Sequence, residues 1–278
     1  MHPPPSTQVE DWMSSPLITA PVGVTTEEIA RLMTDRGIRH IPLLRADGRC
    51  AGGVCDADVF ASGTFVGEGT WMESQSSDPV QLARPLGNVL HHNDELAYAL
   101  SALVRTRSDH AMVLTGTGKP LGIFTEHDAV RAGAQLLHAE LVLPRTAPLH
   151  AVPSTAAINE ALSEMVGAGV RHLVVRDAGK LVGVVSFRDL VAADGSLTAG
   201  EVVPAGPLHT MPMGSPMRWA ASQMASFKIG CLVEVDGEGA AVGIVSRSDI
   251  VAALMSLYDA DEDTGAWEIE AREIDGSR

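Results

Sequence analysis

One short pattern occurs four times in this sequence, and this repetition constrains the fold more than any other feature of the 278 residues. In each copy a Gly lies six residues before an Asp, and apolar or small residues follow the Gly. The copies are Gly52–Asp58, Gly122–Asp128, Gly183–Asp189 and Gly243–Asp249. Successive aspartates lie 70, 61 and 60 residues apart. A near-constant period indicates tandem structural units that pack against one another.

An amphipathic helix is predicted upstream of each copy, because apolar residues recur three and four residues apart. Thr25 and Glu28 form a capping box at the start of the first helix, and Ser215 followed by Pro216 predicts an N-cap for the fourth. The predicted core positions are Ile29, Leu32 and Met33; Leu96, Ala99, Leu100 and Leu103; Ile158, Ala161, Leu162 and Met165; Met217, Ala220, Ala221 and Met224.

Two short apolar strands separated by a Gly-containing turn are predicted between each helix and its Gly…Asp motif, and a short helix follows the motif. Each unit therefore reads strand, helix, strand, strand, helix, which places the chain in the α/β (α+β) class. A unit of about 60 residues buries little surface alone. We therefore expect the units to pair sheet to sheet into two modules, residues 1–135 and 136–258.

Two segments fall outside this pattern. The stretch Ala61–Pro79 is rich in Ser, Gly and Glu and is predicted to be a loop between the first two units. Residues 259–278 open with an acidic run and are predicted to form a flexible tail.

Composition narrows the expected location and partners. The formal net charge of -15 disfavours nucleic acid and anionic lipid as partners. No apolar run approaches the roughly 20 residues of a membrane span, and the first residues lack the basic and apolar regions of a signal peptide. The three cysteines contain no CxxC pair, which favours reduced thiols in the cytoplasm over a redox role.

The repeated unit resembles the CBS domain, named after cystathionine β-synthase, because it ends in Gly, two small or apolar residues, Ser or Thr, two further residues and Asp. The resemblance runs from about Val9 to Tyr258 and includes the segments Gly37–Pro42 and Gly169–Val174. It implies that the units pair into Bateman modules with two clefts each. In many family members such clefts bind AMP, ADP, ATP or S-adenosylmethionine, and sometimes NAD or cyclic dinucleotides.

The resemblance also implies roles for particular residue types. The closing Asp binds ribose hydroxyls, the preceding Ser or Thr contacts ribose or phosphate, and basic residues at the start of the first hairpin strand reach phosphates. The chemistry suits these roles, because an ionised Asp is a pure acceptor and a helix N-terminus favours anions. The candidate ligand-binding residues are Arg39, His40 and Asp58; His110, Thr125 and Asp128; Arg171, His172, Ser186, Arg188 and Asp189; Ser246, Arg247, Ser248 and Asp249.

The four candidate sites are unequal. Cys55 stands where the first unit should have Ser or Thr, and the fourth unit has Ile229-Gly230 where the first and third have Arg-His. We therefore expect fewer than four occupied clefts.

Plainer interpretations remain open for these residues. Each Asp can serve as a helix N-cap without any ligand. His40, His110 and His172 could be metal ligands, but each is alone in its unit, so packing roles are favoured and no metal or cofactor is expected. The clefts could also be empty, in which case the chain would be an interaction or dimerisation scaffold.

An enzymatic role is not expected. The sequence has no P-loop, no GxSxG and no paired metal-ligand motif. Regulatory output is therefore expected to pass through a homodimer or a separate effector protein.

Overall fold

Four small three-stranded sheets confirm the predicted four units, which we call repeats 1 to 4. The computed structural model describes residues 8–61, 63–66, 70–73, 79, 83, 88–106, 108–142 and 148–258. In every sheet a short strand runs parallel to the first strand of an antiparallel hairpin. The strands are β1 (Ala20–Pro21), β2 (His40–Leu44) and β3 (Cys50–Cys55); β6 (Val89–Leu90), β7 (His110–Leu114) and β8 (Pro120–Thr125); β9 (Ala151–Pro153), β10 (His172–Asp177) and β11 (Lys180–Ser186); β12 (Thr210–Pro212), β13 (Cys231–Val235) and β14 (Ala241–Ser246).

Two helices accompany each sheet, one before the hairpin and one after it. The predicted core positions on the first helices are buried, except for Leu32 and Leu162, which are half-buried. The first helices are α1 (Thr26–Arg36), α4 (Leu96–Thr106), α6 (Ile158–Ala168) and α9 (Met217–Phe227). The second helices are α2 (Asp56–Ala61), α5 (Glu126–Leu136), α7 (Phe187–Val191) and α10 (Arg247–Met255).

One of the two predicted helix starts is confirmed and the other is wrong. Thr25 accepts a hydrogen bond from the backbone N–H of Glu28, whose carboxylate accepts one from the N–H of Thr25. Helix α9 instead has Pro216 at its N-cap, and the Ser215 hydroxyl donates to the carbonyl of Pro212. Ser215 therefore closes the turn before the helix and does not cap it.

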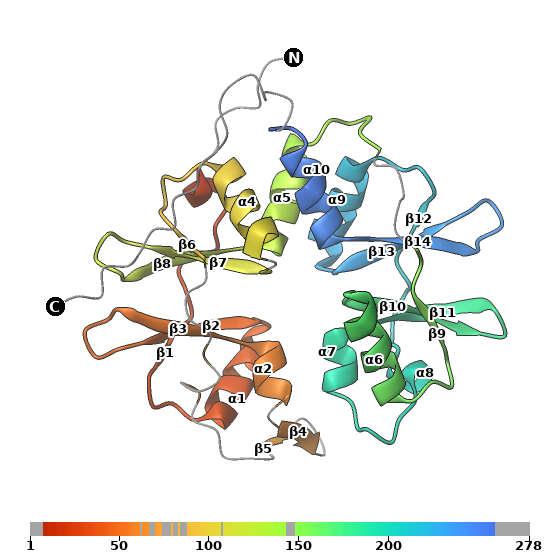
Figure 1. Cartoon of the computed structure of the whole chain (residues 1–278), viewed down its shortest axis with the longest axis horizontal. Coiled ribbons are helices and arrows are strands. Elements are labelled where there is room, and N and C mark those ends of the chain that lie inside the picture. Colours follow the sequence, from red (N-terminus) through yellow and green to blue (C-terminus); the bar gives the residue numbers. More distant parts are fainter. Residues whose placement is uncertain are drawn as a thin grey trace.

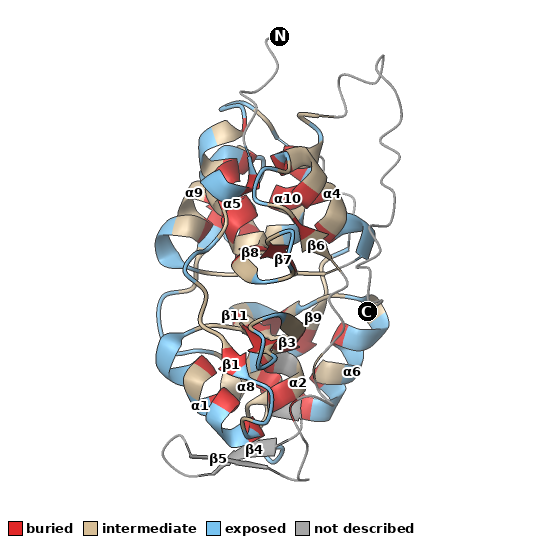
Figure 2. Ribbon diagram, turned by 90° about the vertical axis from the view of Figure 1, so that its left-hand side faces the viewer, coloured by how far each residue is buried: buried red, intermediate tan, exposed pale blue. Residues whose placement is uncertain are grey.

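The four repeats lie in a ring, with repeats 1 and 2 on one side and repeats 3 and 4 on the other (Figure 1). Seen from the side, the sheets face each other across the middle and the helices form the two outer layers (Figure 2). Met112 and Ile123 of repeat 2 cluster with Leu17 and Cys50 from the first repeat's part of the chain. Val174 of repeat 3 clusters in the same way with repeat 4. Apolar sheet-to-sheet contacts thus join each pair.

The two pairs touch through two contacts of different size, one between repeats 2 and 4 and the other between repeats 1 and 3. Helices α4, α5, α9 and α10 share one large apolar core that spans repeats 2 and 4. Gly133 lies where α5 meets α10, and an added Cβ there would come within 2.6 Å of Ile250. Between repeats 1 and 3, Val191 packs on the core of repeat 1, and Arg188 forms an ion pair of 2.9 Å with Asp56. The first contact is broad and apolar, and the second is small and partly polar.

Paired repeats also exchange their opening segments. The 3-10 helix η1 (Val9–Asp11) precedes repeat 1 but hydrogen-bonds to repeat 2, where the N–H of Val9 donates to the carbonyl of Asp94 at 2.8 Å. Helix α8 (Ala199–Val202) precedes repeat 4 but packs on repeat 3, where the N–H of Ala199 donates to Ala156. This exchange ties each pair into one unit.

The predicted loop at Ala61–Pro79 is wrong in part. It contains an antiparallel hairpin of β4 (Gly63–Val66) and β5 (Thr70–Glu73), and β5 lies against α1. The composition of the whole stretch is loop-like, but Phe65, Val66 and Trp71 have high strand propensity. The predicted tail at 259–278 lies outside the described residues. None of the described helices combines the length and apolar character needed to cross a membrane.

Candidate functional site

The closing Asp of repeats 3 and 4 is the third residue of a helix capped by Ser, so the N-cap interpretation of these aspartates is wrong in its position. Asp189 Oδ2 accepts hydrogen bonds from the N–H and the hydroxyl of Ser186 at 2.7 and 2.6 Å. Asp249 Oδ2 accepts the same pair from Ser246 at 2.6 and 2.7 Å. Within the described part of the chain, Oδ1 of Asp189 and Asp249 has no hydrogen-bond partner. Each of these half-buried carboxylates therefore keeps one free acceptor.

Asp128 of repeat 2 has no such free acceptor. Its Oδ2 accepts hydrogen bonds from Thr125, and its Oδ1 accepts one from the Ser14 hydroxyl and one from Arg131, both at 3.0 Å. Asp128 is fully buried, and this burial raises its pKa despite the hydrogen bonds from Thr125. Asp128 therefore exposes no atom to a ligand, which argues against its predicted role in ligand binding.

Repeat 1 uses a thiol where the other repeats use a hydroxyl. Cys55 Sγ donates to Asp58 Oδ2 at 2.9 Å, which reproduces the cap in a weaker form. The three cysteines are thiols and form no disulfide with one another. Burial raises the pKa of the Cys50 thiol, and it raises the pKa of the Cys231 thiol to about 12. A thiol that stays protonated is a poor nucleophile, so these raised pKa values argue against a redox role for Cys50 and Cys231.

Basic side chains from repeats 1, 3 and 4 converge at the centre of the ring. Burial, together with the charges of Arg39 and Arg171, lowers the pKa of Arg247 to about 10, against the opposing effects of Glu126 and Asp109. The Arg247 guanidinium donates a hydrogen bond to the carbonyl of Ile229 at 3.3 Å, and its buried Nε has no partner among the described residues. We call Arg39, Arg171 and Arg247 the central arginines.

The same positive charges lower the pKa of His172. Its pKa falls to about 4, first because of burial and then because of the charges of the three central arginines. From the sequence, Arg247 was a candidate only for the cleft of the fourth unit. It lies near Arg39 and Arg171 because the fold closes the four repeats into a ring.

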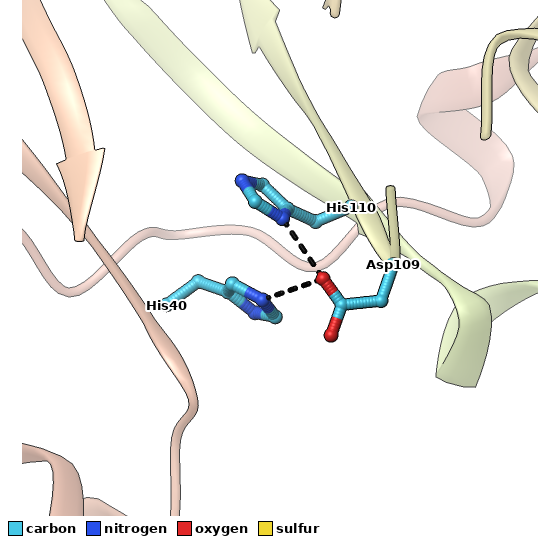
Figure 3. Close-up of side chains that lie close together, drawn as sticks. All are labelled: His40, Asp109 and His110. Carbon is cyan, nitrogen blue, oxygen red and sulfur yellow. Dashed lines mark hydrogen bonds and ion pairs between the residues drawn. The ribbon is translucent and has the colours of Figure 1, made fainter. Parts of the chain in front are cut away.

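Asp109 connects three repeats. Its Oδ1 lies 3.1 Å from Nε2 of His40 and 3.1 Å from Nδ1 of His110 (Figure 3). Arg171 donates to its Oδ2 at 3.1 Å. Burial alone would raise the pKa of Asp109, but hydrogen bonds from His110 and His40, with the nearby charges, hold it well below its usual range. The prediction that each histidine is isolated is therefore wrong for His40 and His110, because pairing of repeats 1 and 2 brings the starts of β2 and β7 together.

Two further candidate residues make contacts between the pairs. Arg188 of repeat 3 forms its ion pair with Asp56 of repeat 1, and the Ser248 hydroxyl of repeat 4 donates to Glu126 of repeat 2 at 3.0 Å. Both lie in the first turn of a second helix, and Ser248 follows Arg247 in the sequence. They therefore link the first turns of the second helices across the ring.

A ring of four paired β-α-β-β-α repeats, with capped aspartates and central arginines, defines a tandem-repeat protein of the Bateman type. The sequence profile of the CBS domain family matches residues 9–62, 141–196 and 199–256. These segments make up more than half of the chain, which therefore belongs to the CBS domain family. Repeat 2, which the profile does not match, has the same order of strands and helices as the other three.

Other proteins share parts of the sequence or the whole fold. An uncharacterised 17.7 kDa protein of Acidianus ambivalens is 28% identical over 138 residues, which cover 49% of this chain and 77% of the relative. The crystal structure of protein MJ1225 from Methanocaldococcus jannaschii superposes with a TM-score of 0.73 at 16% identity, over 89% of this chain and all of that one. A conserved protein from Pyrococcus horikoshii matches over the same shares, with a TM-score of 0.63 at 20% identity.

Proposed function

We propose that this chain is a regulatory protein that binds a phosphate-bearing adenine nucleotide, of the AMP, ADP or ATP type, in the clefts of its paired repeats. The observation that carries the proposal is the environment of Arg247, a half-buried guanidinium near Arg39 whose buried Nε has no partner and which has no carboxylate in ion-pair contact among the described residues. An uncompensated buried cation is costly unless an anion completes its environment.

The charge distribution strengthens this argument. The chain carries a formal charge of -15, yet Arg39 of repeat 1 and Arg171 of repeat 3 lie close enough to Arg247 of repeat 4 to lower its pKa. The Arg39 side chain forms no hydrogen bond or ion pair with any described residue. Phosphate groups suit such a cluster because guanidinium binds them through charge-assisted hydrogen bonds. S-adenosylmethionine carries a sulfonium cation, so the cluster favours nucleotides over it.

The sugar end of the ligand is assigned to repeats 3 and 4. Asp189 and Asp249 each keep a free Oδ1 beside the first turn of a helix, which suits a ribose hydroxyl. Asp128 has no exposed oxygen, and Asp58 is capped by a thiol. Of the two proposed modules, residues 136–258 should therefore contain the stronger sites, and fewer than four clefts should be occupied.

Regulation requires a ligand to favour one arrangement of the repeats over another. The central arginines come from repeats 1, 3 and 4, so an anion held by all three would draw the two pairs together. The small contact between repeats 1 and 3 is the part of the ring that such a ligand would change most. The altered outer surface would then be read by a second copy of the chain or by a separate effector protein.

Isothermal titration calorimetry with AMP, ADP, ATP and S-adenosylmethionine tests the proposal. We expect binding of at least one phosphate-bearing nucleotide, weakened at least tenfold by Arg247→Ala, which removes the half-buried cation. Asp249→Ala should weaken binding through the sugar. Arg105→Ala, which removes an exposed arginine on α4 far in sequence from the cluster, should bind like the wild type.

Two outcomes would reject the proposal. The first is the absence of binding by all four compounds at millimolar concentration, which would favour the scaffold interpretation. The second is equal binding by the wild type and Arg247→Ala, which would place the ligand away from the central arginines.

A further inference from the structure

We propose that His40, Asp109 and His110 form a binding site for a divalent transition-metal ion of the Zn²⁺ class at the junction of repeats 1 and 2. Among the described residues, these three side chains form a group of possible metal ligands. One nitrogen of each histidine and one carboxylate oxygen of Asp109 lie within 4.8 Å of one another. The inference uses different residues from the proposed sugar and phosphate contacts and can be tested without any nucleotide.

The spacing of the donor atoms suits a shared metal. Ligand atoms bound to one ion at about 2.0–2.2 Å lie roughly 2.9–3.5 Å apart for tetrahedral to octahedral angles. Asp109 Oδ1 lies 3.1 Å from His40 Nε2 and 3.1 Å from His110 Nδ1. The two imidazole rings stack beside it, with centroids 4.1 Å apart (Figure 3). A small movement of the rings would place all three donors around one ion.

The surroundings hold the carboxylate in place. Arg171 donates to Oδ2 of Asp109, which leaves Oδ1 facing the two histidines. Hydrogen bonds to the second oxygen of a ligating carboxylate are a common feature of metal sites, because they fix its orientation. His40 and His110 stand at the first residues of β2 and β7, so two hairpins fix the backbone of both ligands. The site is thus built on rigid elements from two repeats.

The hydrogen bonds to Asp109 involve the same ring nitrogens that would bind the metal. Without metal, His40 Nε2 and His110 Nδ1 each share a proton with Asp109 Oδ1. A histidine binds metal through an unprotonated nitrogen, so metal binding would move these protons to the other ring nitrogens.

Two imidazoles and one carboxylate define the class of metal. This donor set suits Zn²⁺, Co²⁺ and Fe²⁺, whereas Mg²⁺ and Ca²⁺ prefer oxygen ligands alone. Three protein donors leave at least one position for another ligand. Because Arg171 contacts Asp109 and Arg39 lies near His40, an anion is the favoured occupant of that position.

The second pair of repeats provides a matched control. His172 occupies in repeat 3 the position that His40 occupies in repeat 1. Opposite it, repeat 4 has Gly230, where an added Cβ would lie 2.8 Å from His172 Nε2. The pair of repeats 3 and 4 therefore has the first histidine but neither the aspartate nor the second histidine.

Titration of the metal-free full-length chain with Co²⁺ and Zn²⁺ tests the site. We expect one equivalent of Co²⁺ to produce the visible absorption of a low-coordinate nitrogen and oxygen site, and Zn²⁺ to displace it. His110→Ala and Asp109→Asn should weaken this binding at least tenfold, with folding checked by circular dichroism. Mg²⁺ should not compete.

His172→Ala should bind Co²⁺ like the wild type, as should His150→Ala, which removes a surface histidine paired with Glu164. His40→Gln provides a second variant at the site, because it keeps a polar side chain in a buried position. Absence of a one-equivalent Co²⁺ spectrum in the wild type would overturn the proposal. Equal binding by wild type and His110→Ala, or equal losses in His110→Ala and His172→Ala, would overturn it as well.

Discussion

Asp109 Oδ1 of repeat 2 lies 3.1 Å from Nε2 of His40 in repeat 1, and this contact ties together two residues that are 69 positions apart in the sequence. The same carboxylate reaches repeat 3 through Arg171. One side chain therefore joins three of the four repeats at the centre of the ring, and the first prediction concerns it.

Asp109→Asn should lower the free energy of unfolding by about 3 kcal/mol, because it removes a largely buried charge that His40, His110 and Arg171 all contact. Urea unfolding at pH 7 without added metal measures this. Asp35→Asn, at an exposed aspartate on α1, should change stability by less than about 0.5 kcal/mol. A loss below about 1 kcal/mol at Asp109 would show that the three contacts contribute little.

Stability should fall on mild acidification because of His172. Its pKa is about 4 in the folded chain and about 6.5 when unfolded, so the unfolded chain binds the extra proton in this range. The stabilisation is complete above pH 6.5 and is lost as the pH falls from 6.5 to 4, by on the order of 2–3 kcal/mol. His172→Leu should flatten this part of the urea-unfolding profile. An unchanged slope would contradict the assignment.

Gly133→Val should destabilise the chain by about 1–3 kcal/mol, because a side chain there would meet Ile250 at 2.6 Å and force α5 away from α10. Gly167→Ala is the matched helical control, since nothing lies within 4 Å of its added Cβ. That change should stabilise the chain by roughly 0.5–1 kcal/mol through helix propensity. Thermal unfolding of the two variants should thus shift in opposite directions, and a common direction would refute the packing argument.

The ion pair between Asp56 and Arg188 should contribute a coupling energy of about 1 kcal/mol to the contact between repeats 1 and 3. Asp56 is buried and Arg188 is partly exposed, so the pair is stronger than a surface ion pair but open to screening by salt. A double-mutant cycle with Asp56→Asn and Arg188→Gln measures it. Coupling of zero would mean that the apolar contact of Val191 alone holds this side of the ring.

Features that depend on residues close together in the sequence could be predicted, whereas features that depend on contacts between distant residues could not. The helix cores around Leu100 and Met224 could be predicted, because spacing along one helix determines which side chains share a face. The capped aspartates at 189 and 249 could also be predicted as a pattern, since cap and helix lie within four residues. The hairpin at 63–73 was missed, because composition averaged over a long stretch hides two short strands.

By itself, the sequence determined that four equivalent units exist, what each contains, and that their motifs end in a carboxylate. Tertiary structure decided how the two pairs close into a ring and which side chains meet there, and so placed Asp109 between His40 and His110, and Arg247 near Arg39. It also decided that Ser14 would cover Asp128 while Asp189 kept a free oxygen. The physical reason is that hydrogen bonds within a turn depend on neighbouring residues, whereas burial and electrostatic coupling depend on packing between units that are distant in the chain.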